Sequence, residues 1–357
     1  MINETEHGSY LSELTIIIFS KDRNAYLGSA INFYSKFNIN TIVVHDCETV
    51  ISASEIPPNC KYLPGSLSIS QRLSQAASVV STKYVVMISD DEFLIPSTLS
   101  KIVSKLKNDE TLFSSFGQTI ALNKYKEKII GNITYKSLRT YSNTNTSIPK
   151  RVSYHLHQNS GLAPIGSVYR VMKFEAFKQL VSAWEKTIDT TSCKYIFEVI
   201  ADIYLLVVGK SEYIDEIVWC RNWINPPISD HTVNRTLYFY QWWEQKEYEN
   251  EKKSFMEQVF SGLSNYITFD KLNDILYDYY ENRKIIELHE LNSIKSKRFS
   301  QLTLKKIADK LKLIKKHFKH LNTDEIQVIL NDIQKTNISY NRNELKMALL
   351  EFKKMNF

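Results

Sequence analysis

The chain has 357 residues, 43% of them hydrophobic, and this is enough to bury one large core or two ordinary ones without disulfides. Its 9 glycines form no GxGxxG or GxxxxGK(S/T) motif and its 4 cysteines form no CxxC pair, which argues against a dinucleotide-binding fingerprint, a P-loop, a structural zinc site and a disulfide framework. The net charge of +6 is uneven, because residues 295–320 hold ten Lys or Arg against one acid and the rest of the chain is about −3.

The N-terminal residues 1–13 are polar and acidic and lack the basic flank and apolar centre of a signal peptide. No apolar run approaches the length of a transmembrane helix, and the longest is Ile203–Val208. With the scattered cysteines, these features predict a cytoplasmic protein.

The first part of the chain alternates apolar runs with helical patterns. Runs rich in β-branched and aliphatic residues predict strands at 14–19, 41–44, 61–63 and 85–88. Apolar residues at helical spacing predict helices over 26–37, 70–80 and 99–106. Alternation at this length implies right-handed βαβ units and a parallel sheet whose polar strand ends face one crevice.

The next part predicts strands in 112–141 with breaks at Gly117 and Gly131, and then a polar loop over 142–149. A strand at 167–171 should lead into a helix at 173–184, and a second helix should span 195–208. On that second helix Glu198 and Asp202 are four residues apart and should share a face.

A change of composition at Asn225-Pro226-Pro227 marks the predicted domain boundary. Residues 1–225 are expected to form one domain, with a nucleotide-binding half at 14–110 and an acceptor half at 111–225. Residues 226–357, which show helical periodicity, are expected to form an all-helical C-terminal region.

The strand at 85–88 stops at three acids, Asp90, Asp91 and Glu92. In open α/β sheets, ligands bind beyond the carboxyl ends of the strands, so carboxylates there suit a divalent metal that carries a phosphate. The alternative is a solvated acidic turn before the next helix. Asp46, at the end of the second strand, and Arg72, in the helix before the acidic strand, favour the ligand site.

Together with the opening IIFSKDRN at 17–24, this layout resembles the family-2-like glycosyltransferases of the GT-A fold over roughly residues 14–223. Their acidic turn is usually written D-x-D. The resemblance implies an α/β fold with a mostly parallel sheet flanked by helices. It also implies a metal-dependent, inverting glycosyltransferase of the hexosyltransferase type. The enzyme would move a sugar from a nucleotide sugar, most readily a UDP-sugar, to a glycan or lipid-linked acceptor in bacterial surface polysaccharide synthesis.

The resemblance also implies roles for particular residues. Phe19, Ser20, Arg23 and Asp46 would border the nucleotide base, and Arg72 would lie near the base or a phosphate. Asp90 would bond the ribose. Asp91 and Glu92 would hold Mn²⁺ or Mg²⁺, although Glu92 departs from the Asp usual in the family. Glu198 would be the base that takes the acceptor proton, with Asp202 as its substitute or partner.

Several polar residues have two interpretations. Arg170 and Arg221 can contact phosphate or acceptor, or form ordinary salt bridges. His155 and His157 alternate as on a strand and can bind a metal with His231, or they can be hydrogen-bonded structural residues.

The C-terminal region contains two further candidates. Tyr238-Phe239-Tyr240-Gln241-Trp242-Trp243 can form a sugar-stacking platform or anchor the helical region to the first domain. Residues 304–321 place lysines around an apolar stripe, so segment 295–321 can lie on an anionic membrane, which would make the protein peripheral to it, or this helix can pack in a bundle.

Two other functions remain open from the sequence. A nucleotidyltransferase also uses paired carboxylates and Mg²⁺, but those enzymes commonly carry a Gly-rich loop after the first strand, and residues 20–24 contain no glycine. The GT-A-like domain can also be inert, with the basic tail binding lipid or nucleic acid. Under the favoured interpretation no nucleic-acid partner is expected.

Overall fold

The computed structural model describes residues 10–47, 50–125, 128–134, 141–158, 168–193, 195–223, 237–297 and 325–355. The apolar runs of the first part form four adjacent parallel strands in the order β3-β2-β1-β4. These are β1 (Leu14–Lys21), β2 (Asn40–Asp46), β3 (Cys60–Pro64) and β4 (Tyr84–Ser89). The helices between and after them are α2 (Asn24–Tyr34), α3 (Ile69–Val79) and α4 (Pro96–Asn108). The predicted strands, helices and parallel pairing of this part are confirmed.

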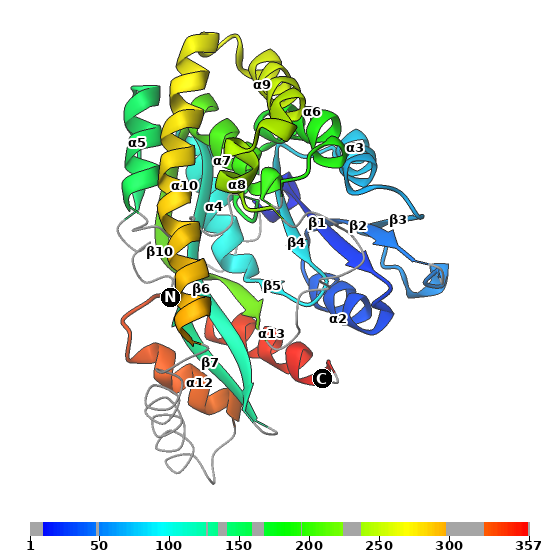
Figure 1. The fold of residues 1–357 in the computed structure, drawn as a ribbon. Helices are drawn as coiled ribbons and strands as arrows, with labels where there is room; N and C mark the ends of the chain where they lie inside the picture. Colours follow the sequence, from blue (N-terminus) through cyan, green and yellow to red (C-terminus); the bar gives the residue numbers. More distant parts are fainter. Residues whose placement is uncertain are drawn as a thin grey trace.

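The sheet continues from β4 through the second part of the chain in the order β9-β6-β10-β5 (Figure 1). The strands are β5 (Phe93–Leu94), β6 (Leu112–Tyr125), β7 (Lys128–Thr134), β8 (Ser142–Asn143), β9 (Val171–Lys173) and β10 (Lys210–Asn222). β6 and β10 are parallel, whereas β9 joins β4 and β6 antiparallel. The result is a mixed, mostly parallel sheet that helices cover on both faces, as the α/β prediction requires.

The remaining helices belong to the second part of the chain and to the C-terminal region. They are α5 (Ile148–Gln158), α6 (Phe174–Thr187), α7 (Ile196–Val208), α8 (Phe239–Glu244), α9 (Glu249–Leu263), α10 (Phe269–Lys297), α12 (Glu325–Gln334) and α13 (Arg342–Lys354). Single 3-10 turns lie at Leu11–Glu13, Ala53–Glu55, Ile188–Thr190 and Lys246–Tyr248.

Three details of the second part differ from the predictions. Residues 142–149, expected as a loop, contain β8 and the start of α5. The strand expected at 167–171 is displaced to β9, and Ser167 lies outside the described residues. β10 was not predicted, because its charged residues at 210, 212, 215 and 216 interrupt the apolar alternation that marks a strand.

Gly117 and Gly131 do not interrupt strands but lie inside β6 and β7. A Cβ atom built at Gly117 would lie 2.5 Å from the backbone oxygen of Glu216, where the β6–β10 register shifts. This glycine therefore permits a close backbone approach at an irregularity between two paired strands.

Replacing Gly117 by Ala is expected to lower the free energy of unfolding by about 1–3 kcal/mol, as overpacking does. The control is Gly28→Ala on α2, where a Cβ meets nothing within 4 Å. That change should stabilise the protein by about 0.5–1 kcal/mol. Urea denaturation measures the free energy of unfolding of both variants. If the Gly117 variant were as stable as the Gly28 variant, β6 and β10 could move apart at no cost.

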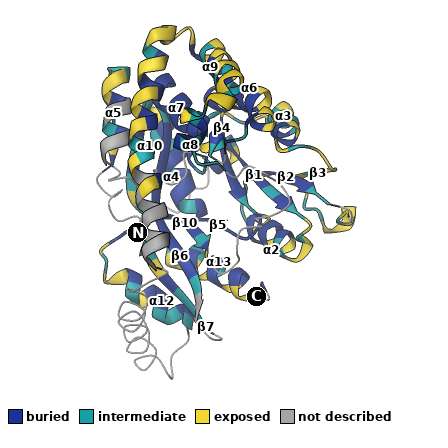
Figure 2. Cartoon of the chain, viewed as in Figure 1, coloured by how far each residue is buried: buried dark blue, intermediate teal, exposed yellow. Residues whose placement is uncertain are grey.

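Both faces of the central strands are buried (Figure 2). Ile17, Val44 and Met87 face the core formed with α3, α6, α7, α9 and α10. The alternate residues of the same strands, such as Ile18 and Ile88, face the core formed with α2, α4, α12 and α13. This explains why these strands are continuously apolar in the sequence.

The helices after residue 225 pack on the sheet and its first helices. The Glu351 carboxylate of α13 accepts hydrogen bonds from Asn32 (2.9 Å) and Lys36 (2.8 Å) of the α2 region, and residues of α12 and α13 share a core with β1. The boundary at 225–227 and residues 298–321 of the basic segment lie outside the described residues, so the domain division stays a prediction. Across the described ranges, no helix is long and apolar enough to cross a membrane.

Candidate active site

The three acids that end β4 are buried, with exposed fractions of 0% for Asp90, 8% for Asp91 and 6% for Glu92. The backbone N–H of Asp90 donates to the carbonyl of Phe19 (3.1 Å), which fixes the turn to the end of β1. The alternative of a solvated acidic turn is therefore wrong. Burial of three neighbouring carboxyl groups needs compensating partners, and each of the three has its own.

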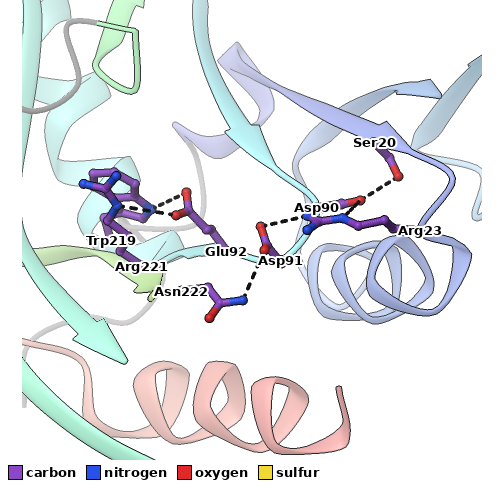
Figure 3. Close-up of polar contacts among 8 residues, drawn as sticks. All are labelled: Ser20, Arg23, Asp90, Asp91, Glu92, Trp219, Arg221 and Asn222. Atoms are coloured by element: carbon purple, nitrogen blue, oxygen red, sulfur yellow. Dashed lines mark hydrogen bonds and ion pairs between the residues drawn. The ribbon is translucent and has the colours of Figure 1, made fainter. Parts of the chain in front are cut away.

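Arg23 lies between two of these carboxylates (Figure 3). Its Nη2 atom contacts Asp90 Oδ1 and lies 3.0 Å from Asp91 Oδ1, and its Nε donates to Asp90 Oδ2 (3.2 Å). The Ser20 hydroxyl also donates to Asp90 Oδ2 (2.6 Å). Asp22, at φ 51°, takes the left-handed conformation that lets the chain turn from β1 into α2 and brings Arg23 over the acids.

The charges of this cluster are coupled. Burial raises the pKa of Asp90 to about 6, and the Asp91 charge acts in the same direction, whereas the Arg23 guanidinium lowers it. Burial alone would lower the pKa of Arg23, but both carboxylates raise it above its ordinary value, so Arg23 is fully charged. Ser20 and Arg23 contact both oxygens of the buried Asp90, so Asp90 holds Arg23, and its expected ribose contact stays a prediction.

A second polar group lies at the ends of β1 and β2. Lys21 and Asp46 are register partners, and Lys21 Nζ lies 3.0 Å from Asp46 Oδ2. Arg72 of α3 is 6% exposed, and its Nε is buried with no hydrogen-bond partner within the described residues. Burial lowers the pKa of Arg72, and the Asp46 charge opposes that change, so the two groups interact. The predicted convergence of Asp46 and Arg72 is present.

Glu92 turns away from Arg23 toward β10 (Figure 3). Its Oε2 accepts a hydrogen bond from Trp219 Nε1 (3.0 Å), and its Oε1 lies 3.8 Å from Arg221 Nε. Burial, followed by the Asp91 charge, raises the pKa of Glu92 to about 8, whereas the Arg221 guanidinium lowers it. Both oxygens of this carboxyl group lie next to residues of β10, and the metal contact expected for Glu92 stays a prediction.

Asn222 completes the surroundings of Asp91, because its Nδ2 donates to Asp91 Oδ2 (3.1 Å). Sequence reasoning missed Asn222 and Trp219 because it assigned no element to β10. The continuous apolar run Ile217–Cys220 was the available signal, although the preceding acids obscured it.

Glu198 lies in the first turn of α7 and is exposed. Tyr169 connects it with the acidic turn. Burial raises the pKa of Tyr169, and the charges of Glu92 and Glu198 act in the same direction. The Tyr169 ring lies against the Trp219 ring, with centroids 4.6 Å apart. Glu198 is thus an exposed carboxylate whose charge acts on Tyr169.

Asp202 shares the expected helix face with Glu198, because both carboxylates interact with Tyr279 of α10. Asp202 is only 2% exposed, and its Oδ2 accepts from the Tyr279 hydroxyl (3.0 Å). Its Oδ1 lies 3.6 Å from His155 Nε2. Asp202 therefore joins α7 to α5 and α10, a structural position that differs from the expected catalytic one.

His155 lies on helix α5, so the strand alternation predicted for His155 and His157 is wrong. His155 is 1% exposed, and its Nδ1 is 2.8 Å from the Tyr141 hydroxyl. These contacts support the structural interpretation of this histidine. The side chain of His157 and all of His231 lie outside the described residues.

Burial lowers the pKa of His155, although Asp202 opposes the change. As pH falls through the unfolded value of about 6.5, the unfolded chain gains a proton that the native state does not, so stability is lost toward acid. The loss due to this residue is at most about 1.4 kcal/mol per pH unit. His155→Gln should therefore lose less stability than the parent between pH 7.5 and 5.5 in urea denaturation. Equal losses would mean that the pKa of His155 is the same in the folded and the unfolded chain.

The other candidates have structural contacts. Arg170 is 0% exposed, donates to the Ser211 hydroxyl (2.7 Å) and lies over the Phe116 ring at 4.4 Å, so its observed partners are neither a phosphate nor an acid. In the aromatic run at 238–243, Phe239 and Trp242 are fully buried and form part of α8. The anchoring interpretation of that run is supported.

A divalent metal fits one position in this cluster. Among the described residues, no three His, Cys, Asp or Glu side chains form a ready-made metal cage. Mg²⁺-type ions are commonly held by one or two carboxylates together with substrate phosphates, so such a cage is not required. Asp91 offers a hard carboxylate donor, and a cation, the Arg23 guanidinium, already lies 3.0 Å from one of its oxygens. Asp91 suits the ion, whereas the Glu92 carboxyl group lies beside Trp219 and Arg221.

Fold and site together define an α/β protein with a buried carboxylate–arginine cluster at the carboxyl ends of its parallel strands. No protein-family model matches the sequence, and no curated protein matches it. Similar solved structures include TarS 1–349 from S. aureus, with 11% identity, 95% of this chain and 88% of that chain covered and a TM-score of 0.48. For the longer S. aureus TarS, the values are 10% identity, 95% and 53% coverage and a TM-score of 0.47, so this chain spans about half of that protein.

A further similar structure is glucosyl-3-phosphoglycerate synthase from Mycobacterium tuberculosis in complex with Mn²⁺, UDP and phosphoglyceric acid. It shares 10% identity, with 72% of this chain and 82% of that chain covered and a TM-score of 0.38. Likeness at this level assigns neither a family nor an activity.

Proposed function

We propose that this chain is a glycosyltransferase that uses a nucleotide sugar, with the donor bound at the carboxyl ends of β1, β2 and β4. The observation that carries the proposal is the arrangement of Asp46, Arg72 and the Arg23–Asp90–Asp91 cluster at one edge of adjacent parallel strands. Nucleotides bind at this edge in open α/β sheets. The residues also supply both kinds of group that a nucleoside diphosphate needs, cations and cation-binding carboxylates.

Within this proposal, Phe19, Asp46 and Arg72 border the nucleobase, and Arg72 or Arg23 pairs with phosphate. Asp90 positions Arg23. Asp91 would hold Mn²⁺ or Mg²⁺, which when bound would offset the negative charge that develops on the departing diphosphate. Glu92, which accepts a hydrogen bond from Trp219, fixes β10 beside the turn and brings Asn222 to Asp91.

Glu198 is proposed as the base for the acceptor hydroxyl, because it is exposed and shares Tyr169 with the acidic turn. A base that takes this proton while the new bond forms suits an inverting transfer. The acceptor is proposed to be a glycan or a lipid-linked sugar. Segment 295–321 is proposed, from its sequence alone, as a contact with an anionic membrane surface.

A thermal-shift panel of nucleotide sugars, each with and without Mn²⁺, tests the function. At about 100 times its Kd, a true donor should add about 2.7 kcal/mol to stability. Stabilisation by one nucleotide sugar, and by the matching nucleoside diphosphate, is expected. If no nucleotide sugar stabilises the chain, the proposed function fails, and stabilisation by nucleoside triphosphates alone would favour nucleotidyl transfer.

A further inference from the structure

The Arg23 guanidinium occupies the position of a cation at Asp91. It is an ionic partner of both carboxylates, and each carboxylate has a further donor, Ser20 for Asp90 and Asn222 for Asp91. One positive charge therefore serves two buried negative charges. Any metal ion that used Asp91 would lie close to a guanidinium that is 3.0 Å from the same carboxylate.

Two cations that contact the same carboxylate repel each other strongly in a buried site, because little water screens their charges. A metal ion alone must therefore bind against Arg23 or displace it. A diphosphate changes this balance, since its oxygens offer the guanidinium bidentate anionic partners of the kind that arginine prefers.

The surroundings of Arg23 allow such a change of partner. Arg23 precedes the first residue of α2 on the loop after β1, and its side chain is 18% exposed, more than that of either carboxylate. Its guanidinium lies 4.9 Å from the centroid of the half-buried Tyr26 ring. Asp90 would keep its hydrogen bond from Ser20 at 2.6 Å after Arg23 moved.

We propose that Arg23 is a built-in counter-cation that holds Asp91 until the donor arrives. This inference rests on the proposed function and adds a regulation of the same site. The nucleoside diphosphate pairs with Arg23, and Asp91 can then bind the metal ion. Metal and nucleotide then bind interdependently, and neither binds well alone. Arg23 acts through Asp91 and is a positioning residue.

Electron paramagnetic resonance of free Mn²⁺ measures metal binding without any turnover. For the parent, UDP should strengthen Mn²⁺ binding by a factor within the usual range for coupled sites, about 5–150. In Arg23→Gln, Mn²⁺ should bind more tightly than to the parent without UDP, by about tenfold, and the strengthening by UDP should shrink.

Arg221→Gln is the matched control, because it removes the same charge from the same cluster at a residue whose ion pair is with Glu92. Its Mn²⁺ affinity without UDP should stay much closer to that of the parent. If both variants gained the same Mn²⁺ affinity, the net positive charge of the site, and not the Arg23–Asp91 contact, would oppose the metal. That result would overturn the proposal.

Two further outcomes overturn it: Arg23→Gln binds Mn²⁺ no better than the parent, or parent Mn²⁺ binding is independent of UDP. The second measurement stands even if Arg23→Gln fails to fold. Failure of the proposed function has a different signature, since UDP would then leave the melting temperature of the parent unchanged with or without Mn²⁺.

Discussion

Replacing Asp91 by Asn is expected to reduce sugar transfer by about 10²–10³-fold, because the loss of a metal-binding carboxylate removes several kcal/mol of transition-state stabilisation. The Mn²⁺-dependent part of the thermal shift produced by the donor should disappear. The fold should persist, since Asn is isosteric and Arg23 keeps its contacts with Asp90. Initial rates and melting curves of the same preparation measure both effects.

The control for this variant is Asp278→Asn, which changes an exposed acid on α10. It should transfer sugar and respond to Mn²⁺ like the parent. An Asp91→Asn enzyme that retains both its rate and its metal-dependent shift would remove Asp91 from the site.

Glu198→Gln is expected to bind the donor as the parent does but to turn over about 10²–10⁴-fold more slowly, the usual contribution of a general base. The reason is that Gln keeps the size and the hydrogen-bonding capacity of the side chain but cannot accept the acceptor proton. Donor affinity by calorimetry and kcat by release of the nucleoside diphosphate separate the two effects.

Glu185→Gln, at an exposed position near the end of α6, is the matched control and should keep full activity. A Glu198→Gln variant that is as active as the parent would mean that another group takes the proton. Weaker donor binding by this variant would instead place Glu198 at the donor.

The first part of the fold could be predicted from the sequence because its strands are buried on both faces. Ile16–Ile18 and Val85–Ile88 read as continuous apolar runs, which is the pattern of parallel strands between two helical layers. Their polar ends then indicate the binding edge, and Asp46, Arg72, Asp90 and Asp91 do converge there.

The second part was less predictable because tertiary contacts override its local pattern. β10 carries charged residues, and its register shifts beside Gly117, so neither its existence nor the contacts of Trp219 and Asn222 follow from periodicity. Burial also changes the chemistry of single groups. Nothing in the sequence indicates that burial raises the pKa of Glu92 or that Asp202 is covered by Tyr279.

The most direct test of the central claim is a crystal structure of the chain grown with UDP and Mn²⁺. The uracil should lie beside Asp46 and Arg72, and the diphosphate should lie next to Asp91, with the Arg23 guanidinium moved from Asp91 to a phosphate. UDP bound elsewhere on the protein, or no UDP at this edge of the sheet at saturating concentration, would contradict the donor site.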